Sequence, residues 1–463
     1  MKLPFLTSIC ISASGVSAAW LATLENGDGS LNGTRLPMPS KDPWMTSAPQ
    51  GWERTSPGTI LRIRPHAYNM SASSVKFDGY SDVFQLLFRS SDSHDQPMLG
   101  VTTVFVPQTS KAVQANSTST IPVLSYHPPY DTACIDASPS YGLQFGEPYG
   151  EIALALKRGW FVSVPDYEGP QASYGANILA GHVILDAAQA VVSTLRHGVP
   201  TAQTPALFSN TTTHNVSIAF WGYSSGATAT DFALELADTY APALTIQGAV
   251  VGGMTANATR SCDLLSGRDV AGLLAQALLG ITTQYPDEQQ LLNAALWPTG
   301  VYNTTEFHSA RNMSGWQSLL HFAYQDMFSY FRDGRAAVFG SEPLLTMLAR
   351  EGWAGRHGTP PTRTRTFYYQ AVGDEMCPST YVDALVSKFC SNRTASSPGS
   401  LFLYQRNLVG GHNDELSNGR QRALDFVGEV LDGTATPLTA GLPATGCVVQ
   451  DVTVSVNPSG PFH

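Results

Sequence analysis

The sequence predicts an α/β protein with a mostly parallel sheet, helices on both faces and one inserted helical segment. Three observations lead to this fold class. Short apolar segments alternate with segments of helical periodicity over residues 121–252, and they do so again over residues 365–431. Between these two stretches, residues 257–350 show helical patterning alone. Strands that alternate with helices through short connections form βαβ units, whose strands are parallel.

The individual elements follow from hydrophobic periodicity. Residues 76–107 alternate apolar and polar side chains and predict early strands at an antiparallel edge. Parallel strands are expected at 121–126, 160–164, 216–221, 247–252, 365–370 and 401–404, with helices at 150–158, 177–198, 231–240, 379–389 and 418–431. The Pro-, Gly- and Ser-rich residues 19–60 are expected to form an extended arm around the core, and the residues after Gly433 show no clear element.

These patterns divide the chain of 463 residues into five parts. They are a signal peptide (1–18), a first part of the α/β core with the N-terminal arm (19–256), a helical cap (257–350), a second part of the core (351–433) and a C-terminal tail (434–463).

The N-terminus has the features of a secretory signal peptide. Lys2 supplies the positive charge, residues 3–16 form a short apolar stretch, and Val16-Ser17-Ala18 is a small-residue cleavage pattern. No other segment reaches about 18 consecutive apolar residues, so a transmembrane anchor is not expected. Sequons for N-glycosylation agree with secretion and predict surface positions; they lie at Asn32, Asn69, Asn116, Asn210, Asn215, Asn257, Asn303, Asn312 and Asn392.

Charge argues against nucleic acid as a partner. The formal net charge is −10, and no run of Lys and Arg exceeds two residues. A protein that follows a phosphate backbone needs a basic stripe, which this chain lacks. Charged residues make up only 13% of the chain while aromatic residues are plentiful, which suits an extracellular protein with an apolar pocket.

Cysteine usage is consistent with an oxidising compartment. Cys10 would leave with the signal peptide, and most of the other five cysteines are expected to be paired, with one left over. Their spacing fits no zinc motif, so neither a metal site nor a cofactor is expected. The five are Cys134, Cys262, Cys377, Cys390 and Cys447.

The strongest local signal is the segment Gly222-Tyr223-Ser224-Ser225-Gly226, which matches the Gly-x-Ser-x-Gly pattern of a nucleophile elbow. Glycines flank the serine because the tight turn from strand to helix leaves no room for side chains. An apolar strand precedes the motif and small residues open a helix after it, a frame that a simple Gly/Ser loop would not need. Ser224 is therefore the predicted nucleophile of an α/β-hydrolase.

A serine hydroxyl needs a base to take its proton. In the α/β-hydrolase fold the acid and the histidine follow the serine in the chain, each after a later strand. Asp374 follows the strand at 365–370, and His412 lies in a Gly-rich turn after the strand at 401–404. We expect His412 to act as the base and Asp374 to orient its imidazole.

Other residues compete for these two roles. Glu375 is an alternative acid because it is adjacent to Asp374, and His127 is an alternative base because it lies near the same edge of the sheet. The remaining side chains are expected in helices or lie too close in sequence to the histidine: Asp383, Asp414, Glu415, His182, His308 and His321.

The tetrahedral intermediate of acyl transfer needs hydrogen-bond donors at its oxyanion. The backbone N–H of Ser225 is one expected donor. The second should come from the loop after the strand at 121–126, which contains Asp131 and has no His-Gly-Gly-Gly pattern. Residue type alone leaves Asp131 open between a turn residue and a catalytic one.

Several segments of the chain, in order, resemble the fungal secretory lipase family, which includes lipase A of the Candida and Pseudozyma type. The resemblance runs from about residue 42 to 433, and its segments include Pro57-Gly58-Thr59-Ile60-Leu61, Asp166-Tyr167-Glu168-Gly169, the elbow, Gly373-Asp374-Glu375 and Gly411-His412. It implies a lipase or esterase with a large helical cap and no metal. It also implies an oxyanion hole formed by Asp131 and the amide of Ser225, with Asp166 and Glu168 as structural anchors. A carboxyl group must be protonated to donate there, which requires a raised pKa.

The sequence therefore predicts a secreted, extracellular serine carboxylester hydrolase, in particular a triacylglycerol lipase that acts through an acyl-enzyme on Ser224. Its expected partner is a lipid or other ester, met at a lipid–water interface, and the chain is expected to act as a monomer. Four alternatives stay open: an esterase for short or non-lipid esters, an acyltransferase, a secreted serine peptidase and an inactive binding homologue.

Overall fold

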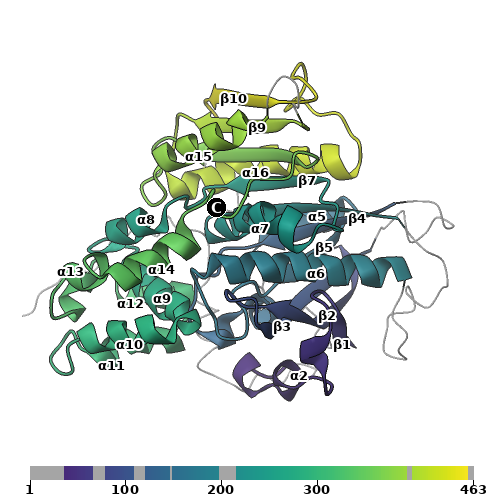
Figure 1. Ribbon diagram of the computed structural model, residues 1–463. Coiled ribbons are helices and arrows are strands. Elements are labelled where there is room, and N and C mark those ends of the chain that lie inside the picture. The colour runs from purple at the N-terminus through teal and green to yellow at the C-terminus, as the bar shows by residue number, and fades with distance from the viewer. Residues whose placement is uncertain are drawn as a thin grey trace, which may run out of the picture.

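The computed structural model describes residues 36–65, 79–108, 120–145, 149–197, 215–393 and 399–456. The predicted signal peptide and the sequons at Asn32, Asn69, Asn116 and Asn210 lie outside these residues. In the described part, a large sheet carries helices on both faces, and a group of further helices lies beside it (Figure 1).

The sheet has ten strands in the described residues, in the order β1-β2-β3-β5-β4-β6-β7-β8-β9-β10. Neighbours from β5 to β10 pair in parallel, whereas β1, β2 and β3 form an antiparallel edge. This confirms the predicted fold class. The strands are β1 (Ile60–Pro65), β2 (Tyr80–Ser91), β3 (Pro97–Pro107), β4 (Ile121–His127), β5 (Phe161–Pro165), β6 (Val216–Tyr223), β7 (Gly248–Gly252), β8 (Arg365–Ala371), β9 (Phe402–Asn407) and β10 (Cys447–Val452).

The central strand β6 shows why these segments are uninterrupted apolar runs. All its residues are buried. Ile218 and Phe220 belong to the core on one face of the sheet, whereas Ala219 and Trp221 belong to the core on the other. Successive side chains of a strand point to opposite faces, so a strand covered on both sides must be apolar throughout.

Helices supply the cover on each face. The first core is completed by α6 (Asn177–His197), α7 (Ser225–Tyr240) and α15 (Ser379–Ser391), and the second by α5 (Gly150–Lys157) and α16 (His412–Leu431). Among the described residues one helix, over Asn177–Arg196, is long and apolar enough to cross a membrane. However, 89% of its apolar stretch of 18 residues is buried within the protein. A helix that is apolar all round suits such a buried position, so α6 is explained as a core helix.

Between β7 and β8 the chain forms a lobe of helices with a core of its own, seen at the left of the sheet in Figure 1. Leu274, Leu278, Phe307 and Phe322 are fully buried in it. That this lobe acts as a cap stays a prediction. Its α-helices are α8 (Ala258–Leu265), α9 (Gly272–Ile281), α10 (Pro286–Ala295), α11 (Thr304–His308), α12 (Gly315–His321), α13 (Ala336–Phe339) and α14 (Glu342–Gly352).

The N-terminal segment, described from residue 36 onward, is less extended there than expected. Before β1 it forms the short helix α2 (Pro43–Thr46) and two short 3₁₀ helices. Asp42 anchors it, because its carboxylate accepts the N–H of Trp44 at 3.0 Å and pairs with Arg64 at 2.6 Å. The prediction leaves out β1, although Leu61-Arg62-Ile63-Arg64 alternates apolar and charged residues as a half-buried strand does.

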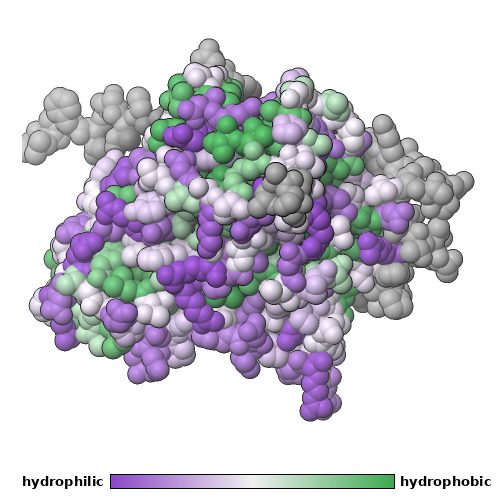
Figure 2. All heavy atoms as spheres, turned by 45° about the horizontal axis from the view of Figure 1, so that its top comes forward, coloured by the Kyte–Doolittle hydropathy of each residue, from purple (hydrophilic) through white to green (hydrophobic). Residues whose placement is uncertain are grey.

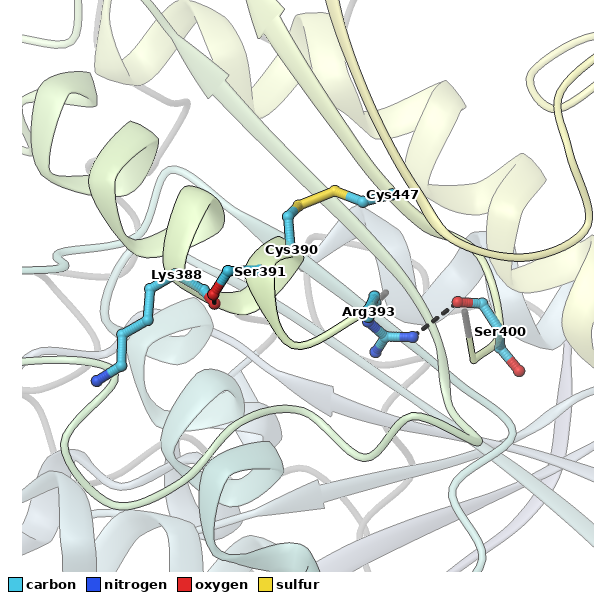
Figure 3. Close-up of a disulfide and its surroundings, with 6 residues drawn as sticks. All are labelled: Lys388, Cys390, Ser391, Arg393, Ser400 and Cys447. Atoms are coloured by element: carbon cyan, nitrogen blue, oxygen red, sulfur yellow. Dashed lines mark hydrogen bonds between the residues drawn. A yellow bond between two sulfur atoms is a disulfide. The ribbon is translucent and has the colours of Figure 1, made fainter. Parts of the chain in front are cut away.

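The C-terminal segment contains a strand, contrary to the absence of any predicted element there. β10 pairs in parallel with β9, and its side chains are half-buried or exposed, as suits an edge. A disulfide joins Cys447 at the start of β10 to Cys390 in the last turn of α15, with Cα atoms 5.6 Å apart (Figure 3). The Thr-, Pro- and Gly-rich residues 434–446 before β10 indicate a loop, whereas Val448, Val449 and Val452 of β10 itself favour a strand.

The expectation that most cysteines would be paired is wrong for this structure. Cys134, Cys262 and Cys377 are free thiols. Burial raises the pKa of each, for Cys262 to about 12, so they are neutral at neutral pH. Cys262 and Cys377 are buried, and buried neutral thiols behave as small apolar side chains, which explains the place of these two in the packed interior.

The surface is mixed in character. Figure 2 shows hydrophilic and hydrophobic side chains interspersed over one face, with hydrophobic ones gathered toward its upper part. At the β9–β10 edge, Leu408, Val449 and Val456 are each more than half exposed.

Candidate active site

The side chains expected to carry the chemistry meet at the end of the sheet where the parallel strands have their carboxyl ends. Ser224 follows β6, Asp374 follows β8 and His412 follows β9. The loop with Asp131 follows β4, and Tyr167 follows β5. In open α/β sheets, ligands bind outside the carboxyl ends of the strands, near the point where the strand order reverses. Here that reversal lies at β5-β4-β6.

Ser224 occupies a strained turn between β6 and α7. Its φ of 55° and ψ of −122° lie in a region that residues other than glycine seldom adopt. Its N–H donates to the carbonyl of Gly252 at 2.9 Å, which fixes the turn. Because α7 starts at Ser225, directly after the nucleophile, the positive end of the helix lies at the serine.

The two glycines of the motif are required by close packing. A Cβ atom on Gly222 would lie 2.2 Å from the carbonyl oxygen of Gly226. A Cβ atom on Gly226 would lie 1.9 Å from the carbonyl oxygen of His127. Both contacts involve backbone atoms, so no side-chain movement could relieve them.

Ser224, His412 and Asp374 form one hydrogen-bonded chain. Nε2 of His412 lies 2.9 Å from Oγ of Ser224, and Nδ1 of the same ring lies 2.7 Å from Oδ2 of Asp374. A proton on Nδ1 is shared with the carboxylate, which leaves Nε2 free to accept the serine proton. This is the arrangement that a serine nucleophile and its base require.

Asp374 is held by donors on both of its oxygens. Nε2 of Gln370 donates to Oδ2 at 2.8 Å. The backbone N–H groups of Met376 and Cys377 donate to Oδ1 at 3.0 Å and 2.6 Å. These bonds fix the carboxylate in the direction of the imidazole.

His412 is the first residue of α16, whereas the helix was expected from residue 418. Asp414 explains the difference, because its carboxylate accepts the N–H of Gly411 at 3.0 Å and caps the helix, although two glycines precede it. The alternative acid, Glu375, accepts the backbone N–H of His412 at 3.0 Å and does not bond the ring. Among the described contacts, the imidazole therefore pairs with Asp374.

The alternative base, His127, is not joined to Ser224. Its Nδ1 lies 2.7 Å from Oγ1 of Thr230 and its Nε2 lies 2.9 Å from Oγ of Ser125. Burial lowers its pKa to about 3, so the ring is neutral and serves the core. The other competitors also have partners elsewhere: Asp383 with Tyr404, Glu415 with Arg422, His182 with Asp92, His308 with Asn293 and His321 with Glu306.

Asp131 lies beside the elbow in an unusual backbone conformation, with φ of 46°. Its Oδ1 is hydrogen-bonded to Oγ of Ser225. Burial raises the pKa of Asp131, while the Ser225 hydroxyl and the charge of His412 act in the opposite direction. A carboxyl with a raised pKa retains its proton to higher pH and can then act as a donor.

The segment Asp166-Tyr167-Glu168 supports the loop that contains Asp131 through hydrogen bonds to residues 128–140. Oη of Tyr167 donates to the carbonyl of Pro128 at 2.7 Å and lies 3.1 Å from Oγ of Ser225. The Glu168 carboxylate accepts the N–H of Thr132 at 3.4 Å. Asp166 accepts the N–H of Ser140 at 2.8 Å.

A cavity of about 70 Å³ opens at Ser224, Ser225 and Asp131. Its far wall comes from the helical lobe and is mostly apolar: Ala258, Ser261, Cys262, Leu265, Leu273 and Ala277. The lobe therefore supplies the surface that a bound acyl group would contact.

Charge at the site favours a protonatable histidine. Burial opposes the charged imidazole, but the hydrogen bond from the ring to Asp374 and the charge of that carboxylate favour it, and the pKa of His412 is raised. Asp374, Cys377 and His412 are also the group of potential metal ligands among the described residues, with ligand atoms within 4.8 Å of one another. Two of the three belong to the hydrogen-bonded chain above.

A model of the secretory lipase family matches residues 142–437 of the chain. The chain belongs to the secretory lipase family. It is 38% identical to the trichothecene C-3 esterase of Fusarium sporotrichioides over 90% of this chain and 88% of that protein. It is 32% identical to lipase A of Arthroderma benhamiae over 85% of this chain and 80% of that protein.

The fold of this secretory lipase is also similar to a solved structure. The X-ray structure of Candida antarctica lipase A superposes with a TM-score of 0.71 and 22% identity, covering 92% of each chain. The α/β-hydrolase fold, the resemblance to fungal secretory lipases and the activity class are thereby confirmed: the protein is a carboxylester hydrolase of the lipase and esterase type.

Five sequons of this secretory lipase lie in described residues. Asn215, Asn312 and Asn392 are exposed. Asn257 and Asn303 are half-buried, and their side chains cap α8 and α11 by accepting backbone N–H groups at 3.0 Å. Glycosylation at all nine positions stays a prediction.

Three side chains at the site were missed by the sequence analysis. Gln370 orients Asp374, Cys377 lines the cavity, and Tyr167 contacts Ser225. A polar residue at the end of a buried strand was an available signal for Gln370. Tyr167 gave none, because only the fold brings the ends of β5 and β6 together.

Proposed function

We propose that this secretory lipase hydrolyses carboxylic esters, lipid esters among them, through an acyl-enzyme on Ser224. One observation carries the proposal: the chain of hydrogen bonds from Oγ of Ser224 through His412 to Asp374, at 2.9 Å and 2.7 Å. A hydroxyl becomes a competent nucleophile when a positioned base takes its proton.

In the first half-reaction, Oγ of Ser224 attacks the ester carbonyl carbon and Nε2 of His412 takes the hydroxyl proton. Asp374 stabilises the resulting imidazolium through Nδ1. The imidazolium then gives its proton to the alcohol oxygen as the C–O bond breaks, which leaves the acyl-enzyme. In the second half-reaction, His412 takes a proton from water as the water oxygen attacks, and returns a proton to Ser224 as the acid departs.

The oxyanion of both tetrahedral intermediates is assigned to two donors. One is the backbone N–H of Ser225 at the start of α7, where the helix dipole also favours negative charge. The other is Asp131 in its protonated form. Its raised pKa and its place beside Ser224 in the cavity support this role.

The helical lobe is proposed to act as a cap over the site. It would comprise residues 257–350, between the two parts of the core at 19–256 and 351–433, with 434–463 as a tail. Its apolar residues from α8 and α9 line the cavity on the side facing Ser224, where an acyl chain would lie. The protein is further proposed to act outside the cell, in agreement with its predicted signal peptide and with three exposed sequons. A monomer is proposed as its acting form.

A second candidate substrate is a non-lipid ester with a short acyl group. It is favoured by the relative named trichothecene C-3 esterase and by a further relative, the probable trichothecene esterase SAT6 of Stachybotrys chartarum, with 33% identity. The cavity of about 70 Å³ agrees with a short acyl group, because pockets for drug-sized ligands measure roughly 300–1,000 Å³. Long acyl chains would require the α8–α9 wall to move.

The test is ester hydrolysis by wild type and Ser224→Ala side by side. The substrates are p-nitrophenyl acetate, butyrate and palmitate, emulsified tributyrin and triolein, and an acetylated trichothecene. Cleavage of long esters that Ser224→Ala loses by roughly 10³-fold or more supports the lipid role. Cleavage of acetates alone supports the second candidate. Equal rates in both proteins would overturn the assignment of Ser224.

A further inference from the structure

The hydroxyl group of Ser225 has a position that its backbone role does not explain. Its amide is the proposed oxyanion donor, yet its side chain points to Asp131 and is hydrogen-bonded to Oδ1. On its other side, Oγ of Ser225 lies 3.1 Å from Oη of Tyr167. A glycine at this position would supply the same amide, so the side chain serves another purpose.

Proton counting orders this chain of groups. The carbonyl of Pro128 can only accept, so the Tyr167 hydroxyl donates to it at 2.7 Å. The same proton can be shared with Oγ of Ser225, which leaves the Ser225 proton free for Asp131. With Oδ1 of Asp131 occupied by that donor, the proton of a neutral carboxyl group must sit on Oδ2.

Oδ2 is the oxygen that remains for the substrate. It makes no hydrogen bond within the described part of the chain, while Asp131 lines the cavity together with Ser224. A carboxyl without this anchor could turn its proton toward either oxygen, and half of those states would present a lone pair to the oxyanion.

We propose that Ser225 and Tyr167 are positioning residues that direct the carboxyl proton of Asp131 toward the oxyanion. The proposal rests on the function assigned above and adds to it two side chains that act through a third. Tyr167 is 2% exposed and bonded to Pro128, so the anchor is rigid. Asp131 has a positive φ, so its loop conformation depends on such support.

Positioning and simple packing predict different pH profiles. Asp131 must be protonated to donate, so kcat/KM should fall as pH rises through its pKa. The Ser225 hydroxyl also stabilises the charged carboxylate and lowers this pKa. Its removal should therefore reduce the rate and at the same time move the falling limb to higher pH.

The experiment measures kcat, KM and the pH profile with p-nitrophenyl butyrate for wild type, Ser225→Ala, Ser225→Thr and Tyr167→Phe. Thr239→Ala, which removes an exposed hydroxyl from the same helix, is the matched control. Labelling of Ser224 by an alkyl phosphonate counts the folded, competent sites. We expect Ser225→Ala to lose roughly 10- to 100-fold in kcat per labelled site with little change in KM, and its alkaline limb to move upward. Ser225→Thr should restore both, and Tyr167→Phe should change both in the same direction by less.

The inference would be overturned if kcat/KM of Ser225→Ala fell on the alkaline side at the same pH as that of wild type. This holds whether the rate of the variant is reduced equally at all pH values or not reduced at all. Asp131→Asn separates this result from failure of the proposed function. If Asp131→Asn keeps the alkaline limb, the limb does not belong to Asp131 and the oxyanion assignment itself is wrong. If Asp131→Asn loses the limb and Ser225→Ala does not move it, only the positioning role is wrong.

Discussion

Nδ1 of His412 lies 2.7 Å from Oδ2 of Asp374. The adjacent carboxylate of Glu375 bonds the histidine backbone instead. This difference assigns the acid of the triad and can be tested directly. Asp374→Asn should leave the protein folded and lower kcat by roughly 10³- to 10⁴-fold, because the amide favours the wrong tautomer of the ring.

Glu375→Gln is the matched control for that substitution. Its amide oxygen can still accept the His412 N–H, so kcat should stay within a few-fold of wild type. Both variants are compared by kcat with a soluble ester and by thermal unfolding. A large loss in Glu375→Gln with a small one in Asp374→Asn would reverse the assignment.

Gly226→Ala should abolish activity and lower the yield of folded protein. The new Cβ would lie 1.9 Å from the carbonyl oxygen of His127 and would force β4 away from the elbow. Gly150→Ala is the control, because a Cβ there meets nothing within 4 Å and Gly150 starts α5. It should be neutral or stabilise by roughly 0.4–1 kcal/mol. Soluble yield and unfolding temperature of both variants test this prediction. An active Gly226→Ala would show that the backbone at His127 can move away from the elbow.

A feature of the fold or of the site could be predicted from the sequence where its physical cause lies within one short segment. The elbow is local: the apolar strand and the two glycines predict Ser224 and its turn. The order of strands predicts that Asp374 and His412 reach the same edge, because the carboxyl ends of parallel strands coincide. The unbroken apolar run of β6 likewise predicts a strand buried on both faces.

Features that depend on contacts between distant segments could not be predicted from the sequence. β10 pairs with β9 and is bonded to Cys390. Its valines favour a strand, but the Thr-, Pro- and Gly-rich residues 434–446 before it indicate a loop and conceal the strand. The start of α16 was placed too late because the glycines and small polar residues there resemble a turn. The link from Tyr167 to Ser225 joins the ends of β5 and β6, which no periodicity reports.

Asp131→Ala should lose roughly 10²- to 10³-fold in kcat, as expected for one oxyanion donor. Asp131→Asn should retain most of the activity, since its amide N–H₂ can donate and Asn tolerates the positive φ of this position. Because the amide does not ionise, the alkaline limb that Asp131 causes should vanish in the Asn variant. Rate against pH for both variants tests this; equal losses in the two would argue against donation.

Removal of the Cys390–Cys447 disulfide should weaken the fold and leave the chemistry intact. It joins α15 to the edge strand β10 across a separation of 57 residues (Figure 3). The double substitution to serine should lower the free energy of unfolding by about 2–4 kcal/mol. Urea unfolding measures this, and kcat per folded enzyme should match wild type. A loss of kcat in the folded state would indicate that β10 supports the His412 end of the sheet.

The contribution of Asp186 to the stability of the fold should be greater in acid than at neutral pH. It is buried in α6, where Ser90 and Tyr240 each donate to its Oδ2 at 2.8 Å. Burial raises its pKa from 3.8 to about 7, in spite of these donors. The folded state therefore binds the proton more tightly than the unfolded chain. The contribution to stability is full below about pH 4 and is lost as pH rises toward 7.

Asp186→Asn keeps an acceptor for both hydroxyl groups and does not titrate. The stability difference between wild type and this variant should change by up to about 1.4 kcal/mol per pH unit between pH 4 and 7, with wild type favoured at the acidic end. Urea unfolding at half-unit pH steps measures that difference. Asp238 is an exposed carboxyl group on the neighbouring helix α7, and Asp238→Asn is the control. The stability difference between wild type and this control should not change with pH. A constant difference between wild type and Asp186→Asn would mean that the buried carboxyl is ionised throughout, and that Ser90 and Tyr240 compensate for its burial.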